Sequence, residues 1–245
     1  NFFMGPSLWS SDLDIFGRSN PEAVTYLSEL YGVYTDLGSH LDMLHESPLC
    51  TGIAHEVDNV YWVFDGHNES IYRYDFQADH GAGFSDHDDG IIARYVEGQV
   101  SYAPGIPSHL VFDERTSLLY IADTGNNRIA VLDTSSGERG YDLLATEEET
   151  THYEVTGAIL STFIDGTDIG LLAPSGLDLV DDILFVTDNE SGEIIAFDMD
   201  GEEVDRLNTG VESGSLMGIV AHSLEDLWLV SATENRVYRL QPYTR

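Results

Sequence analysis

Four stretches of this chain share one internal register, and this repeat limits the folds that the chain can adopt. In each stretch an apolar β-type run is followed by a polar turn and a second run with a β-branched residue, a pattern typical of a hairpin. A single hairpin sheet cannot bury its own apolar face, so a recurring one predicts a stacked or radial array of sheets. The stretches, each with one anchor residue, are 61–75 (Asp65), 121–133 (Asp123), 185–198 (Asp188) and 229–241 (Ser231).

The second stretch and the residues before it resemble an NHL repeat. The relevant sequence is PSHLVFD followed by LYIADTGNNRI, at residues 107–113 and 119–129, and the third copy carries APSGLD at 173–178. The resemblance covers the chain from about residue 51 to the end. It implies an all-β fold, a β-propeller of four-stranded blades, but not a function, because propellers serve as binding modules and as enzymes.

The residues around each hairpin predict the remaining strands of a four-stranded blade. Innermost strands are expected at 52–57, 109–113, 176–180 and 218–222, and outermost strands at 91–96, 158–164 and 203–207. The fourth copy has no outer strand of its own, so we expect the strand-like run at 40–45 to supply it. This N-terminal strand would close the ring and leave no open sheet edge.

Anchor spacing bears on the number of blades. Successive anchors lie 58, 65 and 43 residues apart, with the surplus in 77–90 and 137–157. Four blades are favoured, and the alternative is a ring of five or six in which some blades have lost the repeat pattern. Residues 1–38 show no repeat, and Pro21 after Asn20 predicts a short helix over 21–31. We therefore expect an N-terminal decoration (1–38) and a propeller domain (39–245).

Composition excludes several functions. The chain has 44 Asp and Glu against 10 basic residues, giving a net charge of −34, and all ten basic residues are Arg. Chemistry that needs a lysine Schiff base is excluded, and nucleic acid is a poor partner for so acidic a surface. No run of about 18 apolar residues predicts a membrane span. Adaptation to salt, calcium binding and a composition bias of the lineage are alternative explanations of the charge.

The single cysteine and the first residue bear on the compartment. One cysteine, Cys50, excludes an internal disulfide, and its apolar neighbours predict burial as a small hydrophobic residue. The chain begins with Asn1 and shows no signal peptide, as in a mature product or a trimmed chain. Together with the acidic composition, this favours a secreted or periplasmic protein.

Histidines are the main candidates for a functional site. His55, His109 and His222 fall on three of the four predicted innermost strands, which line the axial channel of a propeller. Three converging imidazoles would suit Zn, Cu or Fe, with Asp178, a loop histidine or water as a fourth ligand. The three do not share one repeat position unless bulges shift them. The alternative is that each is a hydrogen-bonded histidine at the end of a blade.

A second group of metal-ligating residue types lies in the predicted loop 77–90. It contains His80 and His87, four aspartates and three glycines within twelve residues. The loop could fold over the channel mouth and bring His80 or His87 to the axial site. Carboxylate oxygens would also suit calcium, and a solvated acidic loop without a ligand is the third interpretation.

A narrower resemblance concerns the zinc-dependent peptidyl-hydroxyglycine lyase propeller, in which axial histidines from separate blades hold zinc. Pro107, Ser108 and His109 are similar to its Pro-His setting, with one extra residue. The resemblance implies axial histidines with a metal but no particular substrate, and no catalytic residue is assigned.

Three functional hypotheses follow. The first is a metal-dependent propeller, a lyase or an oxidoreductase, that takes a small molecule or peptide at the channel mouth. The second is a non-catalytic propeller that binds a protein or peptide on its rim. The third is a calcium-stabilised surface protein.

Overall fold

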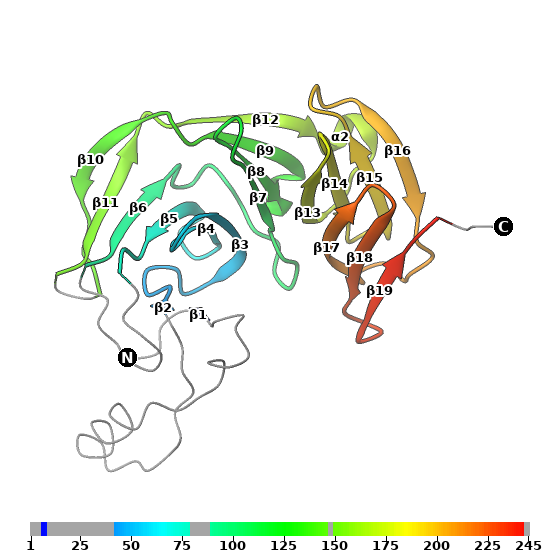
Figure 1. Cartoon of the computed structure of the whole chain (residues 1–245), viewed down its shortest axis with the longest axis horizontal. Coiled ribbons are helices and arrows are strands. Elements are labelled where there is room, and N and C mark those ends of the chain that lie inside the picture. The colour runs from blue at the N-terminus through cyan, green and yellow to red at the C-terminus, as the bar shows by residue number, and fades with distance from the viewer. Residues whose placement is uncertain (1–5, 9–41, 79–88, 147–148, 243–245) are drawn as a thin grey trace, which may run out of the picture.

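The computed structural model describes residues 6–8, 42–78, 89–146 and 149–242, and these residues form an all-β fold with four main sheets. The sheets follow one another along an open arc around their innermost strands (Figure 1). Sheet 1 contains β3 (Cys50–Val57), β4 (Val60–Asp65), β5 (Ser70–Asp75), β6 (Ile91–Tyr95), β10 (Glu138–Asp142) and β11 (Thr151–Thr156). Sheet 2 contains β7 (Leu110–Asp113), β8 (Leu118–Asp123), β9 (Arg128–Asp133) and β12 (Ile159–Asp165). Sheet 3 contains β13 (Pro174–Val180), β14 (Ile183–Asp188), β15 (Glu193–Phe197) and β16 (Glu203–Asn208). Sheet 4 contains β17 (Leu216–Ser223), β18 (Asp226–Ser231) and β19 (Arg236–Leu240).

The predicted hairpins form in the predicted register. In every copy the anchor pairs with the residue five positions later, as Asp65 pairs with Ser70 and Ser231 with Arg236. The predicted inner strands correspond to β3, β7, β13 and β17, and the outer ones to β6, β12 and β16. Two short helices, η1 (Thr124–Asn126) and α2 (Gly166–Ile169), follow β8 and β12.

The anchor aspartates are buried acceptors for backbone donors. The Asp188 carboxylate accepts the N–H groups of Leu172 and Ala173, each at 2.9 Å, and that of Glu190 at 3.1 Å. Asp65 accepts the N–H of Leu49 in the same way. Each carboxylate thus ties a hairpin turn to the segment that leads into the inner strand of its sheet. The anchor aspartates therefore have a structural role.

Neighbouring sheets pack face to face. We call the face of a sheet that is turned toward the next sheet in the chain its trailing face, and the opposite face its leading face. The trailing face of sheet 1 packs on the leading face of sheet 2, with Trp62 and Phe64 against Leu119 and Ile121. The same pairing recurs between sheets 2 and 3 and between sheets 3 and 4. The core is therefore a series of inter-sheet layers.

The insertion at 137–157 does not stay with its own sheet. It forms β10 and β11, and β11 pairs in parallel with β6, so that sheet 1 has six strands. The Arg94 guanidinium holds this pair through Glu154 at 2.6 Å. The segment leaves sheet 2 after β9 and returns to it as β12.

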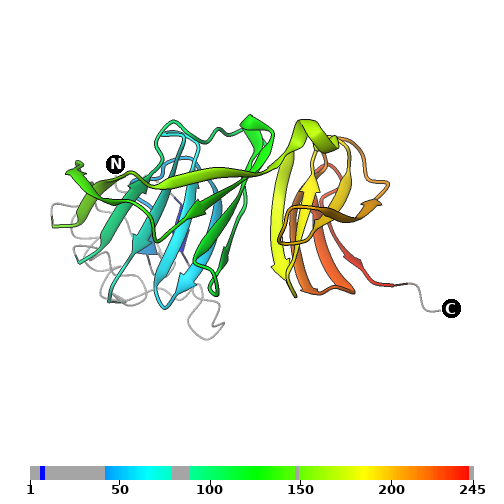
Figure 2. The same cartoon turned by 90° about the horizontal axis from the view of Figure 1, so that it is seen from above.

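The predicted closure is wrong for residues 42–45. The two-residue strand β2 (Asp42–Met43) pairs with β1 (Ser7–Leu8), not with β19. Leu44 is buried with Val63, Tyr72 and Tyr74, so this segment covers part of the leading face of sheet 1. Because β3 begins only a few residues later, packing on sheet 1 needs no long connection. Among the described residues sheet 4 has three strands, and Figure 2 shows sheets 1 and 4 at opposite ends of the row.

Several predictions lie outside the described residues. These are the helix over 21–31, most of the loop that contains His80 and His87, and the domain boundary between residues 38 and 39. The number of blades in a complete ring also stays a prediction.

Candidate functional site

Four residues from four different sheets occupy one repeat position at the centre of the arc. In each sheet one inner-strand residue pairs with the residue that lies two positions before the anchor, as Leu110 pairs with Ile121. The four residues directly precede these inner-strand residues. The residues are Gly52, His109, Gly176 and Gly218. Three sheets therefore carry glycine where sheet 2 carries histidine.

The glycines allow a close approach of the inner strands. A Cβ at Gly52 would lie 1.9 Å from the Ser108 carbonyl oxygen, and one at Gly176 would lie 2.8 Å from Gly218 Cα. A Cβ at Gly218 would lie 2.8 Å from Cε1 of His109. The inner strands thus meet at the axis, and the imidazole of His109 lies against Gly218.

His109 is held by its backbone and not by its ring. Its N–H donates to the Ser175 carbonyl at 3.1 Å, and its carbonyl accepts the Ala122 N–H at 2.9 Å. The side chain is half-buried, and this burial lowers the pKa of His109 below its usual value. Within the described part of the chain no group hydrogen-bonds to the imidazole. A neutral imidazole with a free nitrogen can accept a proton or bind a metal ion.

The structure places the other two inner-strand histidines away from this position. His55 is exposed, its Nε2 lies 3.0 Å from the Asp58 carbonyl oxygen, and its ring packs on Tyr61. His222 is exposed near Asp226. His55 therefore fits the alternative of a hydrogen-bonded histidine at a strand end.

The suggested fourth ligand has another role. The Asp178 carboxylate accepts the N–H of Leu179 at 2.9 Å and that of Ala221 at 2.7 Å, which links β13 to β17. Across residues 6–8, 42–78, 89–146 and 149–242, no three His, Cys, Asp or Glu side chains are grouped to hold a metal ion. His80 and His87 lie outside these ranges, so the predicted metal site stays a prediction.

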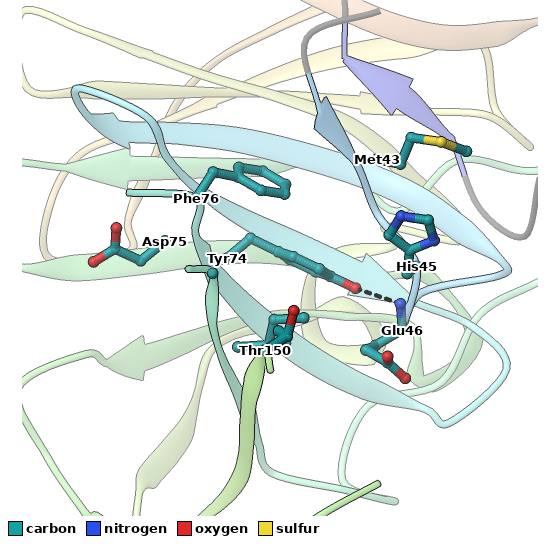
Figure 3. Close-up of a pocket in the computed structure, with 9 residues that line it drawn as sticks. Met43, His45, Glu46, Tyr74, Asp75, Phe76 and Thr150 are labelled. Atoms are coloured by element: carbon teal, nitrogen blue, oxygen red, sulfur yellow. Dashed lines mark hydrogen bonds between the residues drawn. The ribbon is translucent and has the colours of Figure 1, made fainter. Parts of the chain in front are cut away.

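A polar cluster that sequence analysis missed lies beside the N-terminal segment (Figure 3). The buried Tyr74 hydroxyl accepts the Glu46 N–H at 3.1 Å and lies 2.8 Å from the Ser47 hydroxyl. Burial raises the pKa of Tyr74. The adjoining cavity of about 10 Å³, with His45 in its wall, has room for about one water molecule. The cluster therefore secures the N-terminal segment and is too small for a substrate.

Cys50 is half-buried, and its thiol donates to the Gly52 carbonyl at 3.4 Å. Burial raises the pKa of Cys50 to about 11. The thiol is therefore protonated at neutral pH and is a poor nucleophile.

Comparison with solved structures identifies the fold. The chain is similar to virginiamycin B lyase from Staphylococcus aureus, in a catalytically inactive form with quinupristin. The TM-score is 0.51 at 17% identity, over 80% of this chain and 53% of the lyase. It is also similar to a luciferin-regenerating enzyme, with a TM-score of 0.50 at 13% identity over 78% of this chain and 60% of that one. Both are β-propeller proteins. The fold is a β-propeller fold.

The comparisons do not extend to a family. No family model matches the sequence, and no curated protein matches it. The chain spans between about half and three fifths of the length of the two propellers named above. None of the helices that the structure describes has the length and apolar character of a membrane span.

Proposed function

We propose that this chain is a propeller protein that binds a ligand at the axis of its inner strands, with His109 as the group that contacts the ligand. The observation that carries the proposal is the exchange of glycine for histidine at one position of an otherwise glycine-lined axis. The packed inner strands need no imidazole there, because three sheets manage without one. The imidazole of His109 is thus not required for packing of the repeat, and it can contact a ligand.

The state of the imidazole limits the ligand. Burial lowers the pKa of His109, so the ring is neutral at neutral pH and accepts a hydrogen bond. The net charge of −34 disfavours anions. The ligand is therefore a neutral or cationic small molecule or peptide that offers a donor, and in an enzyme the same nitrogen would act as a general base.

Metal binding is a second form of the proposal. The neutral imidazole of His109 is the form that binds Zn, Cu or Fe. Because His55 and His222 are exposed elsewhere, companion ligands would come from other residues, and His80 and His87 are the candidates. Calcium binding by surface carboxylates is a separate alternative, and a secreted or periplasmic location and NHL-type ancestry are parts of the proposal in either form.

The test uses NMR of the histidine ring protons on the whole protein. Fragments with hydroxyl or amide donors, and ZnCl₂ separately, are titrated into wild type, His109→Gly and His222→Gly. We expect some of these probes to shift the His109 resonance and to lose binding at least tenfold in His109→Gly but not in His222→Gly. Probes that all bind without moving His109, or that bind His109→Gly equally well, would overturn the proposal. Elemental analysis of the purified protein decides between the metal and metal-free forms.

A further inference from the structure

Strand β18 differs from its counterparts in how its residues are buried. In β4, β8 and β14 at least five consecutive positions are buried or half-buried, because both faces of their sheets are covered. In β18 buried and exposed residues alternate along the strand. Side chains of a strand alternate between faces, so one face of sheet 4 is covered and the other is open among the described residues.

The open face is the trailing face, and it carries the residues by which the other sheets contact their successors. Three positions before the anchor lie Trp62, Tyr120, Phe185 and Trp228, which are exposed to 1%, 4%, 7% and 36%. The first three pack on the next sheet. Trp228 repeats the same aromatic contact residue, and none of the described sheets lies beyond it.

A second repeat position behaves in the same way. Six positions after the anchor, Ile71, Ile129 and Ile194 are buried, whereas Val237 is 62% exposed. Val220 and Val230 add apolar surface to this face. The charge of Arg239, whose guanidinium lies over the Trp228 ring, is offset by Asp226 at 2.8 Å. The face is thus apolar and locally balanced in charge within a strongly acidic protein.

The outer edge of sheet 4 supplies an independent observation. Sheets 1, 2 and 3 have an outer strand beyond their hairpin, namely β6, β12 and β16, while β19 is an edge strand among the described residues. A hollow of about 330 Å³ lies beside β19, lined by Leu207 of sheet 3, by Leu240 of sheet 4 and by Phe185. In sheets 1, 2 and 3 a further strand lies beside the strand that corresponds to β19.

We propose that the trailing face of sheet 4 and the edge of β19 form a docking surface for one further propeller blade. The blade would present aliphatic residues on its leading face, as Leu227 and Leu229 do in sheet 4. It would also bring the strand that pairs with β19 and fills the hollow. The interface continues the three inter-sheet contacts already present, and an open arc that spans 53% and 60% of two propellers has room for it.

The test adds such a blade to the chain. A second copy of residues 199–241 is joined after Gln241, because Gln241 and Asp198 both lie ten residues after their anchors. The added copy carries Trp228→Phe and every chain in the series carries Trp9→Phe, so that the original Trp228 and the buried Trp62 are the remaining tryptophans and the change in signal reports Trp228. We expect the Trp228 emission to shift to the blue, its quenching by acrylamide to fall at least threefold, and the melting temperature to rise.

A matched control separates docking from mere lengthening. The same extension with Leu227→Asp and Leu229→Asp in the added copy should leave Trp228 as accessible as in the natural chain. Equal quenching in both extended chains would overturn the proposal. So would sedimentation showing that the natural chain dimerises with Trp228 protected, because a second copy would then be the occupant.

A smaller extension keeps the test decisive if the added blade does not fold. Joining only residues 199–210 after Gln241 supplies the outer strand alone. Hydrogen exchange at the amides of β19 should then slow at least tenfold. Unchanged exchange in this variant would contradict the edge-pairing part of the proposal.

Discussion

At the residue scale, the packing of His109 on Gly218 explains why sheet 4 needs glycine at the axis. Any side chain at Gly218 must share space with the imidazole, since its Cβ would lie 2.8 Å from Cε1. Gly176 is different, because its Cβ would meet Thr187 Oγ1 at 2.7 Å and backbone atoms of Gly218 and Ile219 at 2.8 Å. The two glycines are thus required by different neighbours: Gly218 by the imidazole of His109, and Gly176 by the Thr187 hydroxyl and the backbone of β17.

A double-mutant cycle tests this difference. Gly218→Ala should destabilise the wild type by about 1–3 kcal/mol through overpacking, and most of that cost should vanish in a His109→Gly background. Gly176→Ala should cost the same in both backgrounds. Thermal unfolding of the five variants and the wild type measures the coupling. Additive effects of Gly218→Ala and His109→Gly would mean that the imidazole does not lie against Gly218.

At the scale of the element, each hairpin is joined to the preceding segment by one buried anchor. Asp188 is buried, and its two oxygens take three backbone donors from Leu172, Ala173 and Glu190. Sheet 4 uses Ser231, whose hydroxyl lies 2.6 Å from that of Ser215. The anchor is therefore aspartate in three sheets and serine in sheet 4, but it lies at the same position of the hairpin in each.

Replacing this carboxylate should weaken the third sheet. Asp188→Asn puts an amide N–H group opposite backbone N–H donors, so we expect a loss of about 1–3 kcal/mol for a buried group left unpaired. Asp181→Asn, at an exposed turn residue, removes the same charge and is the control. Melting curves of both variants provide the measurement. A similar stability of the two variants would show that the anchor bonds contribute little.

At the scale of the whole molecule, charge opposes folding. Every basic residue is arginine, and the ion pairs of the described residues, such as that of Arg128 with the buried Asp123 at 2.7 Å, use this small supply. The remaining carboxylates repel one another, and salt screens repulsion beyond about 10 Å at 0.1 M and about 3 Å at 1 M.

Added salt should therefore stabilise the protein. We expect the melting temperature to rise between 0.1 and 1 M sodium chloride, by about 2–4 °C for each kcal/mol of repulsion that is relieved. Scanning calorimetry checks this, and a parallel series in millimolar calcium chloride serves as a comparison. A flat curve in sodium chloride would mean that bound cations already neutralise the carboxylates.

The sequence by itself determined the hairpins, their register and the inner and outer strands. These features depend on residues close in the chain, where alternation with period two and turn residues decide which groups pair. The exchange of glycine for His109 at one repeat position is also readable from the sequence once the register is known.

Only the tertiary structure decided that no bulge brings His55 or His222 to the axis, where the N-terminal segment packs and which sheet the 137–157 insertion joins. Pairing is regular from Gly52 to His55, and the later shift in β17 lies between Ala221 and Ser223, so no bulge moves His55 or His222 to the repeat position of His109. The fold offers several apolar sheet faces and edges on which the N-terminal segment and the β10–β11 insertion could pack. Their placement depends on which sheet offers uncovered surface within reach, and that is a property of the assembled fold.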